Sequence, residues 1–291
     1  MFNLPIVGGM ATMPSRENSL IEALPNILKN VDILYLYLDK YEYVPKFLYK
    51  FPKIKIIENL NIGVTGKFLG VQMHHKSCIF FGFDDDIIYP NNYVEYLINA
   101  LSKENFKAIV GVHGLNIKKP FSSFVKDIFS YHFEGKLDES KYVDILGGGT
   151  IAFHSDFFTP NINSWSNKNM DDLVIMRECI EQNLKRVCIS RPKNFLKGIA
   201  KSQPDSIWAQ TKLNDYKETT DMERWLIDAI IDLSSEELIE ETLTKMMYYE
   251  RDDLLQITDI KLFTKSMLKA LTGPVNFSDK NEMIPDIGFS N

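Results

Sequence analysis

Three consecutive aspartates, Asp84, Asp85 and Asp86, directly follow an almost wholly apolar run at residues 78–83. Carboxylates this close together repel one another, and a divalent cation relieves that repulsion. Mg²⁺ or Mn²⁺ prefers carboxylate oxygens and keeps coordination positions open for phosphate, so a cation here could bridge a diphosphate and neutralise a departing anion. The competing interpretation is an exposed acidic turn in front of a helix that begins near Pro90. The apolar strand before the triplet favours the metal site.

A second acidic pair, Asp171 and Asp172, stands at the start of a helical pattern at residues 171–182. An aspartate at a helix start is often a cap for free backbone N–H groups. A carboxylate in that place could instead act as a general base and take the proton from a hydroxyl nucleophile. The residue types alone leave both interpretations open.

One lysine, Lys67, ends a glycine-containing segment at residues 61–67. The segment is not a Walker A phosphate loop, because that motif needs an earlier glycine and a Ser or Thr after the lysine. Here Asn61 or Ile62 occupies the first position and Phe68 the last. We interpret Lys67 as a single cation near a phosphate group, and a solvated lysine at a helix start is the alternative.

Three adjacent glycines at residues 147–149 form another candidate contact. Glycine has no Cβ, so the backbone at Gly148 and Gly149 can approach a ligand closely. A plain tight turn would use the same residues.

The elements that must position these groups follow from the hydrophobic pattern. Short apolar runs predict strands and are separated by segments with helical periodicity. The strands are predicted at residues 4–10, 33–38, 53–57, 78–83, 106–112 and 186–189, and the helices at residues 17–30, 66–76, 91–101 and 171–182. Such alternation indicates an α/β fold with a mainly parallel sheet covered on both faces, whose ligands bind at the carboxyl ends of the strands. This places Thr12, Asp39, Lys67 and the aspartate triplet on one rim.

The composition excludes several classes of protein. The 291 residues are 45% hydrophobic and carry a net charge of −6. Nucleic-acid binding needs a dense basic surface, so we expect no nucleic-acid partner. The three cysteines, Cys78, Cys179 and Cys188, form no CxxC pair and indicate neither a disulfide framework nor a thiolate zinc site. Because the chain shows neither a signal-peptide pattern nor the roughly 20 apolar residues of a membrane span, we expect it in the cytoplasm.

The pattern becomes purely helical after about residue 201. We expect residues 1–200 to form a catalytic domain, with halves at about 1–112 and 113–200, and residues 201–291 to form a helical C-terminal extension. Within the extension, the segment at residues 261–271 is amphipathic, with Lys261, Lys265 and Lys269 on one stripe. It could contact the inner face of the cell membrane. Packing against its own domain is the alternative.

The stretch GFDDDIIYPNNY at residues 82–93 resembles the DXD-bearing segment of GT-A glycosyltransferases. It is especially similar to family 2-like bacterial enzymes that build capsule or lipopolysaccharide glycans. Three more segments match in the right order: residues 11–16 resemble the nucleotide-contacting loop, residues 61–68 the loop with a basic residue facing the donor, and residues 169–173 the motif with the catalytic base. The resemblance covers roughly residues 4–200, and its specificity lies in the ordered set.

The resemblance implies a Rossmann-like sheet and a role for each matched residue. The nucleotide-sugar donor would be contacted by Thr12, Arg16, Asp39, Lys67, Asp84 and Asp85. Asp86 would hold Mn²⁺ or Mg²⁺, with His154 or water as a further ligand. The match favours Asp172 as the base, with Asp171 as the alternative, and places acceptor contacts near Gly148 and Gly149.

The implied reaction moves a hexosyl or N-acetylhexosaminyl group, with inversion, from a nucleoside-diphosphate donor (UDP is favoured) to a hydroxyl of a bacterial surface glycan. The acceptor could be lipid-linked. A sugar-phosphate nucleotidyltransferase is one rival, but it would carry a glycine-rich basic loop after the first strand, where this chain has only Arg16. A non-catalytic module that binds a glycan or a nucleotide sugar is the other.

Overall fold

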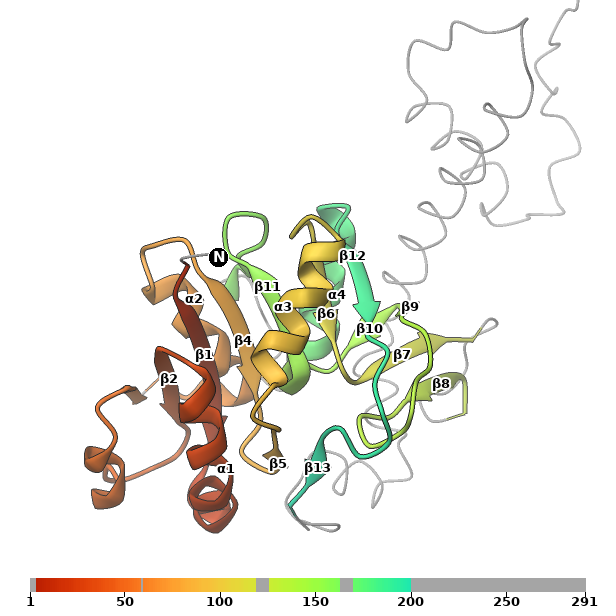
Figure 1. Ribbon diagram of the computed structural model, residues 1–291. Coiled ribbons are helices and arrows are strands. Elements are labelled where there is room, and N and C mark those ends of the chain that lie inside the picture. The colour runs from red at the N-terminus through yellow and green to blue at the C-terminus, as the bar shows by residue number, and fades with distance from the viewer. Residues whose placement is uncertain (1–3, 59, 119–125, 163–169, 200–291) are drawn as a thin grey trace, which may run out of the picture. The chain divides into compact units, whose positions relative to one another are not determined.

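The computed structural model describes residues 4–58, 60–118, 126–162 and 170–199 (Figure 1). The predicted helical extension at residues 201–291, with its amphipathic segment at residues 261–271, lies outside the described residues. So does the boundary expected at residue 200. No helix within the described ranges has the length and apolar character that crossing a membrane requires.

An eight-stranded sheet forms the centre of the fold, in the order β3-β2-β1-β4-β11-β6-β12-β9 (Figure 1). Its strands are β1 (Ile6–Thr12), β2 (Ile33–Leu38), β3 (Ile54–Glu58), β4 (Ile79–Phe83), β6 (Ala108–Gly111), β9 (Lys141–Tyr142), β11 (Ile151–His154) and β12 (Lys185–Cys188). The pairs β1–β2, β2–β3, β1–β4 and β6–β12 are parallel. The expected α/β fold with a mainly parallel sheet is confirmed.

Helices cover both faces of this sheet. They are α1 (Glu17–Asn30), α2 (Leu69–Met73), α3 (Tyr93–Lys103) and α4 (Asp171–Glu181). Helix α1 buries Leu20, Ala23, Leu24 and Ile27, a spacing that puts all four side chains on one face of a helix. The termini of α1 and of β2 agree with the sequence-based expectation, because both elements have strong local periodicity.

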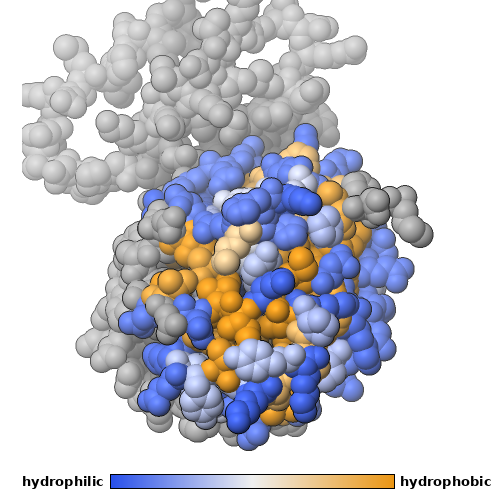
Figure 2. Space-filling model, turned by 90° about the vertical axis from the view of Figure 1, so that its left-hand side faces the viewer, coloured by the Kyte–Doolittle hydropathy of each residue, from blue (hydrophilic) through white to orange (hydrophobic). Residues whose placement is uncertain are grey.

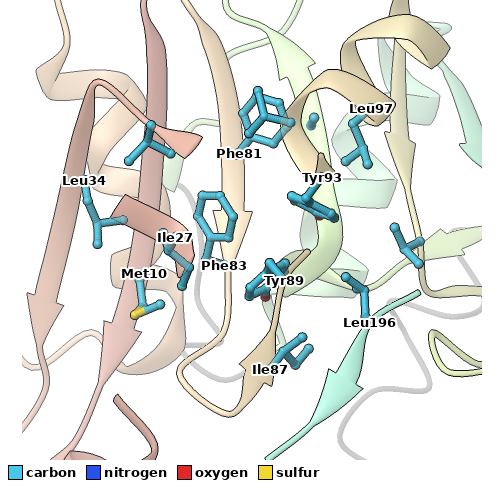
Figure 3. Packing of buried hydrophobic residues seen from close by; sticks show 14 of the residues in the cluster. Met10, Ile27, Leu34, Phe81, Phe83, Ile87, Tyr89, Tyr93, Leu97 and Leu196 are labelled. Atoms are coloured by element: carbon cyan, nitrogen blue, oxygen red, sulfur yellow. The ribbon is translucent and has the colours of Figure 1, made fainter. Parts of the chain in front are cut away.

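The alternation of side chains along β4 explains why its sequence is apolar throughout. Phe81 and Phe83 point to one face and pack on Tyr93 of α3, with ring centroids 6.1 and 5.9 Å apart (Figure 3). Phe80 points to the other face and packs on Phe68 and Phe153, at 5.9 and 5.1 Å. A strand covered on both faces needs apolar residues at every position.

Two small sheets join segments that are distant in the sequence. One is β10-β7-β8, built from β10 (Ile145–Leu146), β7 (Gly114–Ile117) and β8 (Ile128–Tyr131). The other pairs β5 (Ile87–Ile88) with β13 (Lys197–Gly198). The second pairing attaches the last described residues to the chain directly after the aspartate triplet.

Strand β11 is the strand whose direction matters most for the site. It runs antiparallel to both of its neighbours, β4 and β6. Its first residue, Ile151, pairs with Gly111 at the carboxyl end of β6. The glycine turn in front of β11, the 3-10 helix Gly148–Thr150, therefore arrives at the rim where the parallel strands end.

Some apolar surface is exposed away from the core. Figure 2 shows one side of the molecule, where apolar surface gathers inside a polar border. Within residues 4–73, the large hydrophobic side chains that are more than 45% exposed are Ile21, Tyr43, Tyr49, Leu60 and Met73. We assign them no part in the site.

Candidate functional site

The rim at the carboxyl ends of β1 and β2 holds Thr12 and Asp39 side by side. The Asp39 backbone N–H donates to the Thr12 carbonyl oxygen at 2.8 Å. The Tyr37 hydroxyl donates to Asp39 Oδ1 at 3.0 Å and accepts the Ile62 N–H at 3.1 Å. Both Thr12 and Asp39 are buried, so these contacts fix the polar groups at one place on the rim.

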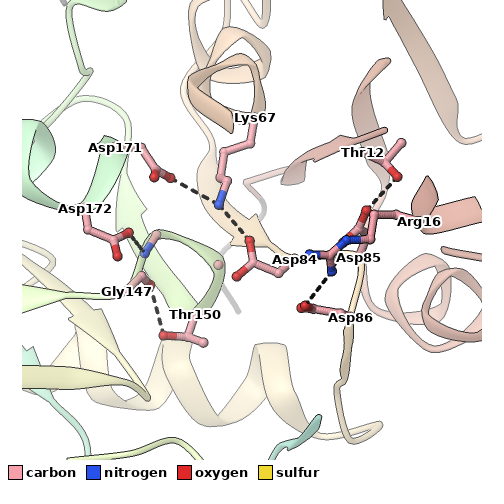
Figure 4. Close-up of polar contacts among 12 residues, drawn as sticks. Thr12, Arg16, Lys67, Asp84, Asp85, Asp86, Gly147, Thr150, Asp171 and Asp172 are labelled. Atoms are coloured by element: carbon pink, nitrogen blue, oxygen red, sulfur yellow. Dashed lines mark hydrogen bonds and ion pairs between the residues drawn. The ribbon is translucent and has the colours of Figure 1, made fainter. Parts of the chain in front are cut away.

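The three aspartates after β4 point in different directions, and each has its own partner (Figure 4). Asp84 Oδ1 accepts a hydrogen bond from Lys67 Nζ at 2.7 Å. Asp85 Oδ2 accepts from the Thr12 hydroxyl at 2.6 Å. Asp86 Oδ2 accepts from Arg16 Nη1 at 2.9 Å. Two cations and a hydroxyl thus offset part of the repulsion within the triplet.

The electrostatics of the triplet still disfavour full ionisation. Burial, together with the repulsion of Asp86, raises the pKa of Asp85 to about 7, against the opposing effect of the Thr12 hydrogen bond. Burial and then the neighbouring Asp84 carboxylate also raise the pKa of Asp86. A further positive charge at this point would therefore stabilise the ionised triplet.

Lys67 connects the triplet to the second acidic pair. Its Nζ lies 2.7 Å from Asp84 Oδ1 and 3.1 Å from Asp171 Oδ2. Burial alone would lower the pKa of Lys67, but the carboxylates of Asp171, Asp84 and Asp172 outweigh burial and raise it. The lysine is therefore charged and buried between carboxylates, and the alternative of a solvated lysine at a helix start is excluded.

Asp171 and Asp172 begin α4, as expected, but they have different surroundings. Asp171 is buried beside Lys67. Asp172 is partly exposed, and its Oδ1 accepts the Gly148 backbone N–H at 2.6 Å. Burial, followed by the repulsion of Asp171, raises the pKa of Asp172 to about 7. A carboxyl group with this pKa can accept a proton near neutral pH.

The glycine turn is packed against both acidic groups. A Cβ on Gly149 would overlap the carboxyl group of Asp84, and a Cβ on Gly148 would lie 2.6 Å from Asp171 Oδ2. A Cβ on Gly82 in β4 would overlap the Gly148 carbonyl oxygen. The turn therefore needs glycine for close approach within the protein itself, a requirement that goes beyond the plain tight turn considered from the sequence.

Tyr89 belongs to this site, although we predicted no role for it there from the sequence. Its buried hydroxyl accepts the Asp84 backbone N–H at 2.8 Å and donates to the Gly149 carbonyl oxygen at 2.6 Å. The hydroxyl thus joins the triplet to the glycine turn. The only signal in the sequence is that Tyr89 lies inside the segment that resembles the DXD stretch.

His154 is not at the site, and its prediction as a metal ligand is wrong. Strand β11 is antiparallel to β4 and pairs His154 with Ile79, the first residue of β4. Asp84 follows the other end of β4, about 16 Å away at roughly 3.3 Å per residue. His154 instead accepts the Asp156 N–H at Nδ1 and packs on Phe106 and Phe157.

The remaining expected residues meet at one rim, and two of their carboxylates suit a divalent cation. Among the residues that the structure describes, no three His, Cys, Asp or Glu side chains converge into a complete metal-binding group. The Asp84 and Asp86 side chains are 38% and 33% exposed, whereas that of Asp85 is 9% exposed. Two open carboxylates that repel each other fit a hard cation whose other ligands are phosphate and water oxygens. Asp85 is bound inward to Thr12.

Comparisons with known proteins give structural likenesses only. No family model and no curated protein matches the sequence. The fold is similar to that of GalNAc-T7 with UDP, GalNAc and Mn²⁺ (TM-score 0.48, 12% identity, 65% of this chain and 43% of that chain). It is also similar to S. aureus TarS 1–349 (0.42, 11%, 65% and 58%) and to the mannosyltransferase PcManGT from Pyrobaculum calidifontis in complex with GDP-Man and Mn²⁺ (0.42, 12%, 67% and 56%). The chain spans about half the length of these structures. We therefore infer its function from its own residues.

Proposed function

We propose that this chain is a metal-dependent GT-A glycosyltransferase that moves a sugar from a nucleoside-diphosphate donor to a hydroxyl of a bacterial surface glycan, in the cytoplasm. The observation that carries the proposal is the convergence of two acidic groups with different properties. One is an open carboxylate pair beside two cations, and the other is a partly exposed carboxyl group with a pKa near 7. Lys67 bridges the two groups.

On the donor side, Asp84 and Asp86 would hold Mn²⁺ or Mg²⁺. When bound, the cation would neutralise the charge that develops on the departing diphosphate. Arg16 and Lys67 fix the directions of these two carboxylates through their ion pairs at 2.9 and 2.7 Å. Thr12 and Asp39 lie on the same rim, which supports the assignment of this side to the nucleotide, with uridine favoured by the motif resemblance.

On the acceptor side, Asp172 is the better candidate for the base. Asp171 is buried in an ion pair with Lys67, which keeps it away from a nucleophile. Asp172 is partly exposed and its Oδ1 is held by the Gly148 N–H. Its position beside Gly148 and Gly149 supports the assignment of this turn to acceptor contacts.

The proposed step is a direct displacement. The acceptor oxygen forms a bond to the anomeric carbon of the sugar while the bond from that carbon to the diphosphate oxygen breaks. Asp172 takes the proton of the acceptor hydroxyl, and the nucleoside diphosphate leaves with the bonding electron pair. One displacement inverts the configuration at the anomeric carbon.

A panel of nucleotide sugars tests the function. Binding to the native state raises its apparent stability, so we expect one donor class to raise the unfolding temperature when Mn²⁺ is present. With that donor, turnover should release a nucleoside diphosphate and a sugar with inverted linkage. Release of pyrophosphate would instead identify a nucleotidyltransferase, and tight donor binding without transfer or hydrolysis would identify a non-catalytic module.

A further inference from the structure

The hydroxyl of Tyr89 lies between two backbone segments that are far apart in the sequence. It accepts the N–H of Asp84, directly after β4, at 2.8 Å and donates to the carbonyl oxygen of Gly149, directly before β11, at 2.6 Å. The side chain is 1% exposed. Its ring packs edge-on against Phe83 and Tyr93, each with a centroid distance of 4.9 Å. Packing on two rings leaves the hydroxyl little freedom to move.

The two segments that Tyr89 joins belong to the two sides of the proposed reaction. Asp84 is one of the two carboxylates suited to the cation. Gly149 is in the turn whose Gly148 N–H holds Asp172. Gly149 also leaves no space for a side chain, because the Asp84 carboxyl group fills it. A small shift of either segment would therefore move the other.

We propose that Tyr89 is a positioning residue that sets the place of Asp84 relative to the glycine turn. Through Asp84 it also sets the ion pair with Lys67, and Lys67 in turn contacts Asp171 at the start of α4. Because its buried hydroxyl is bonded to two backbone groups, Tyr89 acts through Asp84 and the glycine turn. This inference rests on the proposed function for its meaning in catalysis, but the contact itself can be tested without any donor or acceptor.

Tyr93 provides a matched control. It belongs to the same aromatic cluster and is 0% exposed. Its hydroxyl has no hydrogen-bond partner among the described residues. Tyr93→Phe removes an equally buried hydroxyl without breaking a hydrogen bond, whereas Tyr89→Phe leaves a partly buried N–H and a buried carbonyl oxygen without their partner.

The experiment compares Tyr89→Phe with Tyr93→Phe and with the wild-type chain by two measurements. The rate of hydrogen exchange at the Asp84 amide reports its hydrogen bond to the Tyr89 hydroxyl. Titration with Mn²⁺ alone, without donor or acceptor, measures the metal affinity of the Asp84 and Asp86 carboxylates. We expect Tyr89→Phe to speed exchange at Asp84 and to weaken Mn²⁺ binding about tenfold, the lower end of what loss of a ligand-supporting contact produces. Tyr93→Phe should leave both values unchanged.

The outcomes separate this inference from the proposed function. Unchanged Asp84 exchange and unchanged Mn²⁺ affinity in a folded Tyr89→Phe chain would overturn the role of Tyr89. If Tyr89→Phe does not fold, hydrogen exchange in the wild-type chain provides the test. An Asp84 amide that exchanges far faster than the β4 amides would equally overturn the role of Tyr89. Failure of the wild-type chain to use any nucleotide sugar would refute the glycosyltransferase instead, whatever the exchange data show.

Discussion

Lys67 Nζ lies 3.1 Å from Asp171 Oδ2, and the two side chains are only 6% and 8% exposed. The same ammonium group holds Asp84 at 2.7 Å. A buried lysine is costly unless it is paired with an opposite charge, and removing one partner of a buried pair is strongly destabilising. The lysine therefore supports the fold and the site at once.

Replacing this lysine should destabilise the protein. Lys67→Met keeps the apolar stem but leaves Asp171 buried without its cation, so we expect the free energy of unfolding to fall by about 3 kcal/mol. Chemical denaturation measures the change. The matched control is Lys185→Met, because Lys185 is 56% exposed and pairs with Glu104 only at 3.5 Å. That surface pair should contribute no more than about 1 kcal/mol. Equal stability of the two variants would contradict the bridging role of Lys67.

The rate of transfer should depend on the protonation of Asp172. A general base must be ionised to take a proton, and burial raises the pKa of Asp172 to about 7. We therefore expect kcat/KM to be low in acid and to rise with pH through about 7. Asp172→Asn should retain only a small residual rate without this acid limb. A rise through neutral pH that persists in the Asn variant would assign the base to another group.

The same carboxyl group should affect the pH dependence of folding. Its folded pKa of about 7 lies above the ordinary 3.8, so between these values the folded state binds more protons than the unfolded state. Stability should then decrease as pH rises from about 4 to about 7. Asp172→Asn can still accept the Gly148 N–H and should show a smaller decrease. Urea denaturation at a series of pH values in the presence of a chelator measures both slopes, and identical slopes would argue against the raised pKa.

A methyl group added at the glycine turn should disturb the triplet. Gly149→Ala places Cβ where the Asp84 carboxyl group lies. We expect overpacking to lower the free energy of unfolding by about 1–3 kcal/mol, and displacement of Asp84 to slow turnover about 100-fold. Gly198→Ala is the control, because its Cβ would meet its nearest neighbours at an ordinary 3.7 and 3.8 Å. Full activity of Gly149→Ala would show that Asp84 can move without consequence.

Removal of the cation should abolish transfer. Chelation should stop turnover by the wild-type chain, and addition of Mn²⁺ should restore it. Asp86→Ala should remain folded but lose both turnover and the rise in unfolding temperature that Mn²⁺ and donor produce together. Asp138→Ala removes an aspartate that is 75% exposed on the surface and should behave like the wild type. An Asp86→Ala chain that stays fully active after chelation would refute the metal-dependent mechanism.

The sequence was sufficient to predict the local elements and the rim. The bounds of β2 and α1 follow from periodicity within each segment. The carboxyl ends of parallel strands meet at one edge, and this rule alone brings Thr12, Asp39 and the aspartate triplet together.

What the sequence did not predict depends on contacts between distant segments. The direction of β11 is decided by its pairing with β4 and β6, and without that direction His154 looked like a neighbour of the triplet. The sequence also could not identify the partners of the carboxylates, because these pairs join residues that are far apart in the chain. Arg16 and Lys67 were expected to face a ligand, yet both turn toward aspartates. In the sequence, little distinguishes Tyr89 from the other aromatic residues, and only the structure shows that its hydroxyl bonds two backbone segments.

The path from β6 to β11 has a consequence for how such a site can diversify. The chain leaves the sheet after Gly111 and returns at Ile151, and these two residues are partners in neighbouring strands. The described residues between them, 112–118 and 126–150, belong to an excursion that is anchored at both ends on neighbouring strands, and apart from the two-residue strand β9 these described residues add no strand to the sheet. Lengthening or exchanging a segment whose ends are fixed in this way adds little to the entropic cost of closing the loop. The part of this excursion that precedes the glycine turn could therefore be exchanged while the turn keeps its contacts with Asp84 and Asp172.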